Sequence, residues 1–260
     1  MGVLNLTPDS FSDGGRWLDV DAAVAQADAM AAAGAAIIDV GGESTRPGAA
    51  PVDADEECAR VLPVIERLAQ RLAIPLSIDT SKPEVMRRAV AAGAGFINDV
   101  RALRAPGALE AARECAVPVC VMHMLGEPRT MQQAPHYDDV VAEVRAFLQT
   151  RADACVAAGI PRSHIVVDPG FGFGKTLAHN TQLLSHLDAI VADGLPVLAG
   201  VSRKAMIGAL TGQATPAERV AGSVAAATLA AERGARLLRV HDVAETVQAL
   251  AVVAALLETD

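Results

Sequence analysis

HIVVDPGFGFGK, residues 164–175, joins a short buried strand to a glycine-rich turn and decides the fold. The β-branched run 165–167 has the composition of a strand covered on both faces. Asp168 ends the run, and the proline after it stops the strand. Glycines at 170, 172 and 174 then allow the backbone to turn tightly and approach a ligand. Alone, the stretch is also compatible with a turn in which Asp168 is a structural cap, because its glycine spacing matches neither a P-loop nor a dinucleotide fingerprint.

The same succession of apolar strand and polar tip recurs along the chain. Eight apolar runs are separated by connections of helix length: 3–6, 36–40, 76–78, 96–100, 117–122, 165–167, 197–201 and 237–240. Strands that alternate with helices predict parallel β-α-β units, and eight units predict a closed barrel, which needs about 250 residues. We therefore expect an α/β chain folded as one (β/α)8 TIM barrel domain over residues 1–260.

Glycine and proline mark the boundaries of these elements. A glycine suited to the left-handed position after a helix precedes every second strand, at Gly34, Gly93, Gly159 and Gly234. A proline, tolerated at the first residue of a strand, precedes three others, at Pro75, Pro118 and Pro196. Two stretches predict capped helix starts, Ser81-Lys82-Pro83-Glu84 and Thr215-Pro216-Ala217-Glu218.

Composition limits the classes of function. The chain has 260 residues, of which 52% are hydrophobic, and a net charge of −9, which argues against nucleic acid or an acidic membrane as a partner. Its four cysteines lack the Cys-x-x-Cys spacing of a zinc site and are expected to be reduced thiols. With neither a signal peptide nor a membrane-length apolar run in the sequence, we expect a cytoplasmic protein.

Polar side chains follow all eight expected strands, at the face where a barrel carries its active site. Any one of them could be a simple cap, but together they divide into two kinds. One kind provides the donors and acceptors for a flat polar heterocycle: Asp79, Asn98, Asp168 and Lys204. The other kind is cationic and, with the glycine-rich loops, suits phosphate: Arg46, Arg203, Arg239 and His241.

In order along the chain, these stretches resemble the motifs of the dihydropteroate synthase family. The two most specific are MGVLNLTPDSFSDGG (residues 1–15) and GGESTRPG (residues 41–48). The others are at 78–80, 97–100, 168–175, 200–204 and 239–242. Family members usually carry a short segment before the first strand, so we expect the N-terminus of this sequence to be trimmed.

The resemblance implies a transferase of folate biosynthesis and a target of sulfonamides. Its reaction condenses 7,8-dihydropterin-6-ylmethyl diphosphate with p-aminobenzoate, by dissociative loss of diphosphate and attack of the aromatic amine. Ionised Asp168 would accept from the pterin edge, Lys204 would donate to its acceptor atoms, and Asn98 would do both. Asp79 would face the ring and stabilise the positive charge that develops on it.

The family pattern also assigns the other groups. Asn5, Arg239 and His241 would take the diphosphate, Asn5 together with the expected cofactor Mg²⁺. The p-aminobenzoate carboxylate would lie near Ser202 and the helix start after Arg203. Four residues would close over this ring: Phe11, Thr45, Arg46 and Pro47. Met122 and Phe173 would wall the pterin pocket. We expect the loops 7–18 and 42–53 to become ordered only with bound ligands.

Several questions stay open at this point. His123 is expected in the core, and Lys175 pairs either with Asp168 or with substrate. Four histidines are expected on the surface: His136, His164, His179 and His186. The stretch 220–231 is apolar almost all round, which favours a homodimer. Two alternatives to the synthase are a pterin-binding methyltransferase domain and a non-catalytic pterin-binding paralogue.

Overall fold

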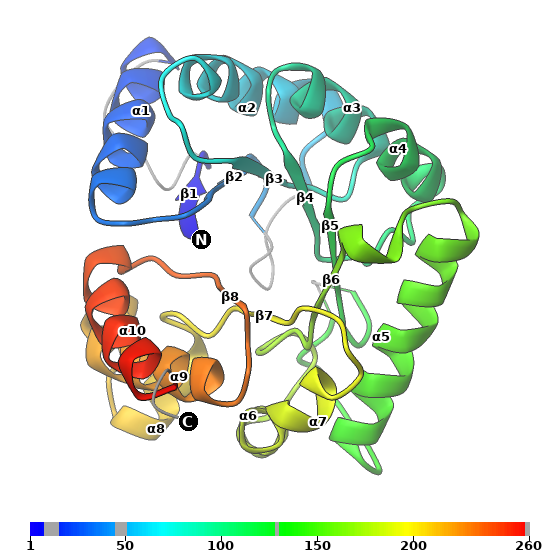
Figure 1. Cartoon of the computed structure of the whole chain (residues 1–260), viewed down its shortest axis with the longest axis vertical. Coiled ribbons are helices and arrows are strands. Elements are labelled where there is room, and N and C mark those ends of the chain that lie inside the picture. Colours follow the sequence, from blue (N-terminus) through cyan, green and yellow to red (C-terminus); the bar gives the residue numbers. More distant parts are fainter. Residues whose placement is uncertain (8–15, 45–50, 128–129, 258–260) are drawn as a thin grey trace.

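The computed structural model describes residues 1–7, 16–44, 51–127 and 130–257, and it has the expected (β/α)8 barrel (Figure 1). All eight expected strands are present within the described residues: β1 (Gly2–Asn5), β2 (Ile38–Gly41), β3 (Leu76–Asp79), β4 (Phe96–Asp99), β5 (Val119–Met122), β6 (Ile165–Asp168), β7 (Leu198–Ala199) and β8 (Leu237–Leu238). The last two strands are shorter than the sequence predicts. The expected motifs at 8–15 and 45–50 lie outside the described residues.

Parallel pairing closes the barrel. Strands β1 to β6 form one sheet in chain order, and β7 pairs with β8. Two isolated parallel bridges join these parts, Gly2 with Val240 and Val167 with Val197. The Val3 N–H donates to the Val240 carbonyl at 3.0 Å. The carboxyl ends of all eight strands therefore meet at one face, and the polar tips meet with them.

Ten α-helices in the described residues surround the strands (Figure 1). They are α1 (Arg16–Ala32), α2 (Ala54–Ala69), α3 (Pro83–Ala91), α4 (Ala108–Cys115), α5 (Val140–Ala157), α6 (Leu177–Ser185), α7 (Leu187–Val191), α8 (Ala205–Thr211), α9 (Val220–Glu232) and α10 (Val243–Leu257). Each buries an apolar stripe against the barrel, as α2 does with Val61, Ile65 and Leu68. The connections after β6 and β7 contain two helices each, which the strand count did not predict.

The glycines and prolines predicted at element boundaries are confirmed, and the two predicted capping boxes are wrong. The glycines that precede β2, β4, β6 and β8 have φ between 95° and 120°. The carbonyl of Pro75 accepts from the Ile38 N–H at 3.2 Å, so this proline leads directly into the ladder. The N-cap of α3 is Lys82 and makes no side-chain cap bond, because the Ser81 hydroxyl donates to Asp99 instead. Thr215 likewise makes no side-chain cap bond before the short 3₁₀ helix Pro216–Arg219.

The main apolar core lies between the strands and the helices. Leu4, Ile38 and Ile165 are fully buried there. The four cysteines are free, as predicted. Among the described residues, no helix is both long enough and apolar enough to cross a membrane.

Candidate active site

Arg239, just after β8, crosses to the carboxylates of two other strands. Its Nε donates to Asp39 Oδ2 at 2.6 Å, and its Nη2 donates to Asp79 Oδ2 at 2.7 Å. Asp39 lies within β2 and Asp79 ends β3, so the contacts span 200 and 160 residues of sequence. The sequence placed Arg239 with the cations for diphosphate, and the structure brings it to the carboxylate side of the site.

Asp79 is an ionisable group with a strongly perturbed environment. Burial raises the pKa of Asp79, Arg239 lowers it and the charge of Asp39 raises it, and the net result is a pKa of about 7. Asp39 and Asp79 repel each other, and pairing both with the Arg239 guanidinium offsets this repulsion. The two carboxylates in turn raise the pKa of Arg239 against the effect of burial. Buried carboxylates with shifted pKa values are typical of functional sites.

Asp168 and Lys204 meet at the tips of β6 and β7. Asp168 is 5% exposed, and its Oδ1 accepts from the Gly170 N–H at 2.7 Å. Burial raises the pKa of Asp168, while the nearby Lys204 ammonium lowers it. The Lys204 Nζ donates to the Phe171 carbonyl and lies 4.6 Å from the centre of the Phe173 ring. Burial lowers the pKa of Lys204 to about 8. A buried acceptor, Asp168, and a half-buried donor, Lys204, are thus presented close together.

An apolar cluster borders this polar pair. Met122, Met124, Met131 and Val100 pack together, and the partly buried Phe173 packs against them. Met122 ends β5 beside Asp168, its partner in the ladder. Met122 and Phe173, the two residues expected to wall a pterin pocket, therefore belong to one apolar cluster next to the hydrogen-bonding groups.

Lys175 holds the glycine-rich loop. Its Nζ lies 2.8 Å from His123 Nδ1 and donates to the carbonyls of Gly170 at 3.0 Å and Phe173 at 3.1 Å. Lys175 is 3% exposed, and burial lowers its pKa to about 7. A Cβ at Gly170 would lie 1.8 Å from the His123 carbonyl oxygen, so the close approach needs glycine here. The open question of what Lys175 pairs with is answered by His123 and these backbone carbonyls.

Apart from His241, the histidines divide into one buried residue and four that reach the surface. His123 is buried, as predicted, and burial together with the Lys175 charge lowers its pKa to about 3. His136 and His186 are exposed, as predicted. His164 and His179 are partly exposed, so they lie at the surface with part of each side chain covered. His179 completes a capping box with Thr176 at the start of α6, a role that its sequence position alone does not reveal.

The cations expected around phosphate are divided among separate contacts. His241 Nδ1 lies 3.1 Å from Ser202 Oγ, which also accepts from the His241 N–H. Arg203 instead forms a two-pronged pair with Asp242. Arg203 and Arg239 are both paired with carboxylates. Among the described residues, the positive charge available for phosphate is therefore less concentrated than the sequence suggests.

The helix start after Arg203 is partly occupied. The Arg203 N–H donates to Ser223 Oγ at 2.8 Å, and the Lys204 N–H donates to the Val201 carbonyl at 3.3 Å. Helix α8 begins only at Ala205. Two of the backbone donors expected there for a carboxylate are therefore already used, and the Ser202 hydroxyl beside them lies 3.1 Å from His241 Nδ1. The other expected p-aminobenzoate residues lie outside the described residues: Phe11, Thr45, Arg46 and Pro47.

Asn5 ends β1 and Asp79 ends β3, and Gly41 of β2 lies between them in the ladder. A Cβ at Gly41 would lie 3.7 Å from Asn5 Oδ1 and 3.5 Å from Asp79 Cβ, so glycine leaves room between these groups. Among the described residues no group of three or more acidic, histidine or cysteine side chains is arranged to enclose a metal. Mg²⁺ is often bound by few protein ligands and completes its coordination shell with substrate phosphate and water. The amide oxygen of Asn5, at an open strand tip, fits a site of this kind.

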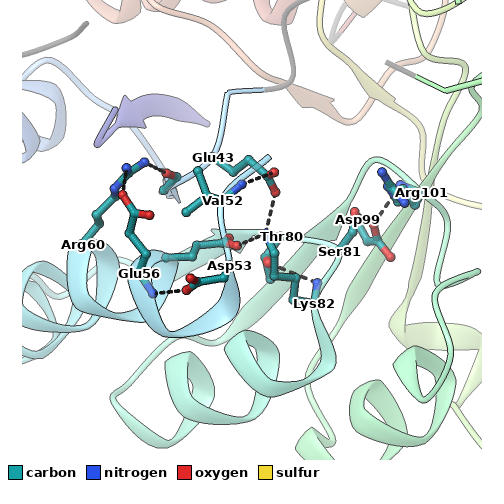
Figure 2. A network of polar contacts seen from close by, with 12 residues as sticks. Glu43, Val52, Asp53, Glu56, Arg60, Thr80, Ser81, Lys82, Asp99 and Arg101 are labelled. Atoms are coloured by element: carbon teal, nitrogen blue, oxygen red, sulfur yellow. Dashed lines mark hydrogen bonds and ion pairs between the residues drawn. The ribbon is translucent and has the colours of Figure 1, made fainter. Parts of the chain in front are cut away.

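A second polar network lies behind the tips of β2, β3 and β4 (Figure 2). Lys82 Nζ forms ion pairs at 2.5 Å with Glu43, which follows β2, and with the fully buried Glu57 of α2. Glu43 Oε1 also accepts from the Val52 N–H at 3.1 Å. Asp99 accepts from Ser81 and from the Arg101 N–H, which makes it a structural cap. Sequence reasoning missed Lys82 and Glu57, since helix and loop positions give no sign of such pairing.

Comparison with known proteins agrees with this geometry. The model of the pterin-binding enzyme family matches residues 1–241. Dihydropteroate synthase of Escherichia coli K12 is 55% identical over 99% of this chain and 91% of that protein. That of Haemophilus influenzae is 51% identical over 97% of this chain and 91% of that protein. The chain belongs to the dihydropteroate synthase family of pterin-binding enzymes.

Solved structures of dihydropteroate synthases superpose closely on the chain. That of Xanthomonas albilineans with 4-aminobenzoic acid has a TM-score of 0.94 and 60% identity, over 98% of this chain and 92% of that one. That of Burkholderia cenocepacia with 7,8-dihydropteroate has a TM-score of 0.90 and 52% identity, over 100% and 91%. Family membership favours the synthase reaction over the methyltransferase alternative. The expected barrel and transferase class are both confirmed.

Proposed function

We propose that the chain catalyses the dihydropteroate synthase reaction with the strand-tip residues in the roles set out below. The observation that carries this assignment is the buried Asp168 and the half-buried Lys204 beside the Met122 and Phe173 surface. Asp168 has an Oδ2 available for donors of the pyrimidinone edge, and Lys204 is a donor for its acceptors. Asn98, buried at the tip of β4, completes the edge.

Bond breaking releases the diphosphate first. The bond between the exocyclic methylene carbon and the bridging oxygen breaks, and the diphosphate leaves with the electron pair. The electron-rich pterin ring takes up the positive charge, which the Asp79 carboxylate stabilises. The lone pair of the neutral aromatic amine then forms the new C–N bond, and the amine loses a proton to water. Catalysis consists of holding the ring, withdrawing the diphosphate and excluding water.

Arg239 serves the leaving group as well as the carboxylates. Arg239 has donors that its carboxylate partners do not occupy, and His241 and Asn5 lie on the tips beside it. Bound Mg²⁺ would neutralise the diphosphate, and Asn5 is the residue that would hold it. We assign Ser202, Thr45, Arg46, Phe11 and Pro47 to p-aminobenzoate, a ligand also present in the Xanthomonas albilineans structure.

The same proposal covers inhibition, assembly and location. A Yersinia pestis dihydropteroate synthase, 53% identical, has been solved with a sulfonamide, and we infer that sulfonamides compete for the p-aminobenzoate position here. An apolar hollow of about 310 Å³ lies between α6, α8 and α9, and Leu210 and Leu229 border it. We infer that a second copy of the chain covers it in a homodimer. Residues 1–260 would act as one domain in the cytoplasm, where the free cysteines stay reduced.

The direct test is product formation. The protein is incubated with Mg²⁺, dihydropterin diphosphate and p-aminobenzoate, and the products are identified by mass spectrometry. Dihydropteroate should form only when all components are present. A non-catalytic paralogue would bind the pterin and form no product, which would contradict the proposal.

A further inference from the structure

Asp39 is a fully buried carboxylate at the centre of the pterin side of the site. It is 0% exposed and accepts from side chains of three other parts of the barrel, β3, β4 and the segment after β8. Ser77 Oγ donates to its Oδ1 at 2.5 Å, while the Asn98 amide at 3.2 Å and Arg239 Nε at 2.6 Å both donate to its Oδ2. In the sequence it lies inside the apolar run 36–40, and a charged residue within such a run is a signal that could have singled it out.

The contact with Asn98 decides which way the amide faces. An ionised carboxylate only accepts hydrogen bonds, so Asn98 must turn its NH₂ group toward Asp39. Its Oδ1 then faces away from Asp39, and the two ends of the amide cannot exchange without losing this bond. Asn98 therefore offers a fixed acceptor to a ligand, which selects a ligand edge that carries an N–H donor at that point.

The contact with Arg239 fixes a plane. The guanidinium is planar, and two of its nitrogens are bound to two different carboxylates, Asp39 and Asp79. This leaves its remaining edge with one orientation. Since Asn98 and Arg239 share the single Oδ2 atom of Asp39, the orientation of the pterin-side amide and that of the guanidinium are set by the same group.

We propose that Asp39 is a positioning residue, which selects the pterin edge by orienting Asn98 and holds Arg239 in the plane used for the reaction. The inference rests on the proposed function, and it adds a residue that makes no substrate contact of its own. A purely structural buried ion pair would predict a loss of stability only. A positioning role predicts, in addition, a loss of pterin affinity that depends on Asn98.

The first experiment uses Asp39→Asn, which keeps the shape and removes the all-acceptor character. Calorimetry measures the affinity of the folded protein for 6-hydroxymethylpterin, which has the ring and no diphosphate. We expect this affinity to fall about tenfold or more, because Asn98 is no longer confined to one orientation. Asp28→Asn removes an exposed carboxylate paired with Arg71 and should leave the affinity unchanged. Unchanged affinity in folded Asp39→Asn would overturn the proposal.

A double-mutant cycle separates positioning from general damage. In an Asn98→Ala background, Asp39→Asn should reduce pterin affinity by less than about threefold, because the group that Asp39 orients is already gone. Full additivity of the two losses would contradict a role through Asn98. If Asp39→Asn does not fold, Ser77→Ala releases the Oδ1 side of Asp39 while keeping its charge. This variant should weaken pterin binding about threefold, and unchanged binding would contradict the proposal.

The controls also separate this inference from the proposed function. If the parent protein forms no dihydropteroate, the proposed function fails. If the parent is active and Asp39→Asn keeps its pterin affinity, only the positioning role fails.

Discussion

At the scale of single residues, Asp79 and Lys204 need opposite protonation states to act. Burial raises the pKa of Asp79 to about 7 and lowers that of Lys204 to about 8. The Asp79 charge is lost as the pH falls through about 7, and the Lys204 ammonium is lost as the pH rises through about 8. The pH profile of kcat/KM should therefore be bell-shaped, with its two limbs in this range. In Asp79→Asn the acidic limb should disappear, and its persistence would assign that limb to another group.

Asp168→Asn tests the pterin edge at the same scale. The amide oxygen can still accept from the Gly170 N–H, so the turn is kept, while the amide nitrogen meets pterin donors with a further donor. Pterin affinity measured by calorimetry should fall by about 2–3 kcal/mol, the worth of charged hydrogen bonds. Equal binding by parent and variant would remove Asp168 from the site.

The sequence predicts which residues stand at the strand tips, and it does not predict their pairing. Asp79, Asn98, Asp168 and Lys204 could be selected because each follows an apolar run. The ion pairs of Arg239 with Asp39 and Asp79 could not be predicted, since they depend on how the barrel closes between its first strands and its last. The same holds for Lys175, whose partners are mostly backbone carbonyls.

At the scale of elements, Lys82 ties α2 and the segment after β2 to the end of β3. Lys82→Met leaves Glu57 buried without its cation and should lower the free energy of unfolding by about 3–5 kcal/mol. The loss should shrink as the pH falls, because burial already raises the pKa of Glu57 and protonation removes its charge.

Chemical denaturation of Lys82→Met and of Lys82→Met/Glu57→Gln checks this account. The double variant should regain most of the stability, since no fully buried charge remains without its partner and the remaining Glu43 carboxylate is partly exposed to water. Arg87→Met, at an exposed pair with Glu114, is the matched control and should change stability little. A Lys82→Met protein as stable as the parent would mean that Glu57 is neutral in the folded state.

Element boundaries show what local chemistry decides. The glycines before β2, β4, β6 and β8 were predictable, because a left-handed residue after a helix has a strong sequence preference. The capping box predicted at Ser81 does not form, because Asp99 at the end of the next strand accepts the hydrogen bond of the same hydroxyl. Tertiary partners thus override local signals where strand tips crowd together.

At the scale of the whole molecule, the alternation of strands and helices was enough to predict the barrel. The face that contacts another molecule could not be predicted in this way, because it depends on which apolar side chains the packed helices leave exposed. Leu210 and Leu229 are 57% and 45% exposed beside the apolar hollow between α6, α8 and α9. Leu229→Glu would place a charge at the centre of the proposed dimer contact. Light scattering should show a dimer for the parent and a monomer for this variant, with the fold intact by circular dichroism. A monomeric parent would contradict the assembly.

The central claim is that the site withdraws diphosphate before the amine attacks. Dihydropterin diphosphate is prepared with ¹⁸O at the oxygen that joins the methylene carbon to the α-phosphate. It is incubated with protein, Mg²⁺ and benzoate, which would occupy the p-aminobenzoate position and has no amine. Reversible cleavage should move the label into a non-bridging position of the α-phosphate, and Asp79→Asn should slow this exchange. Product formation by the parent without any such scrambling would contradict the account.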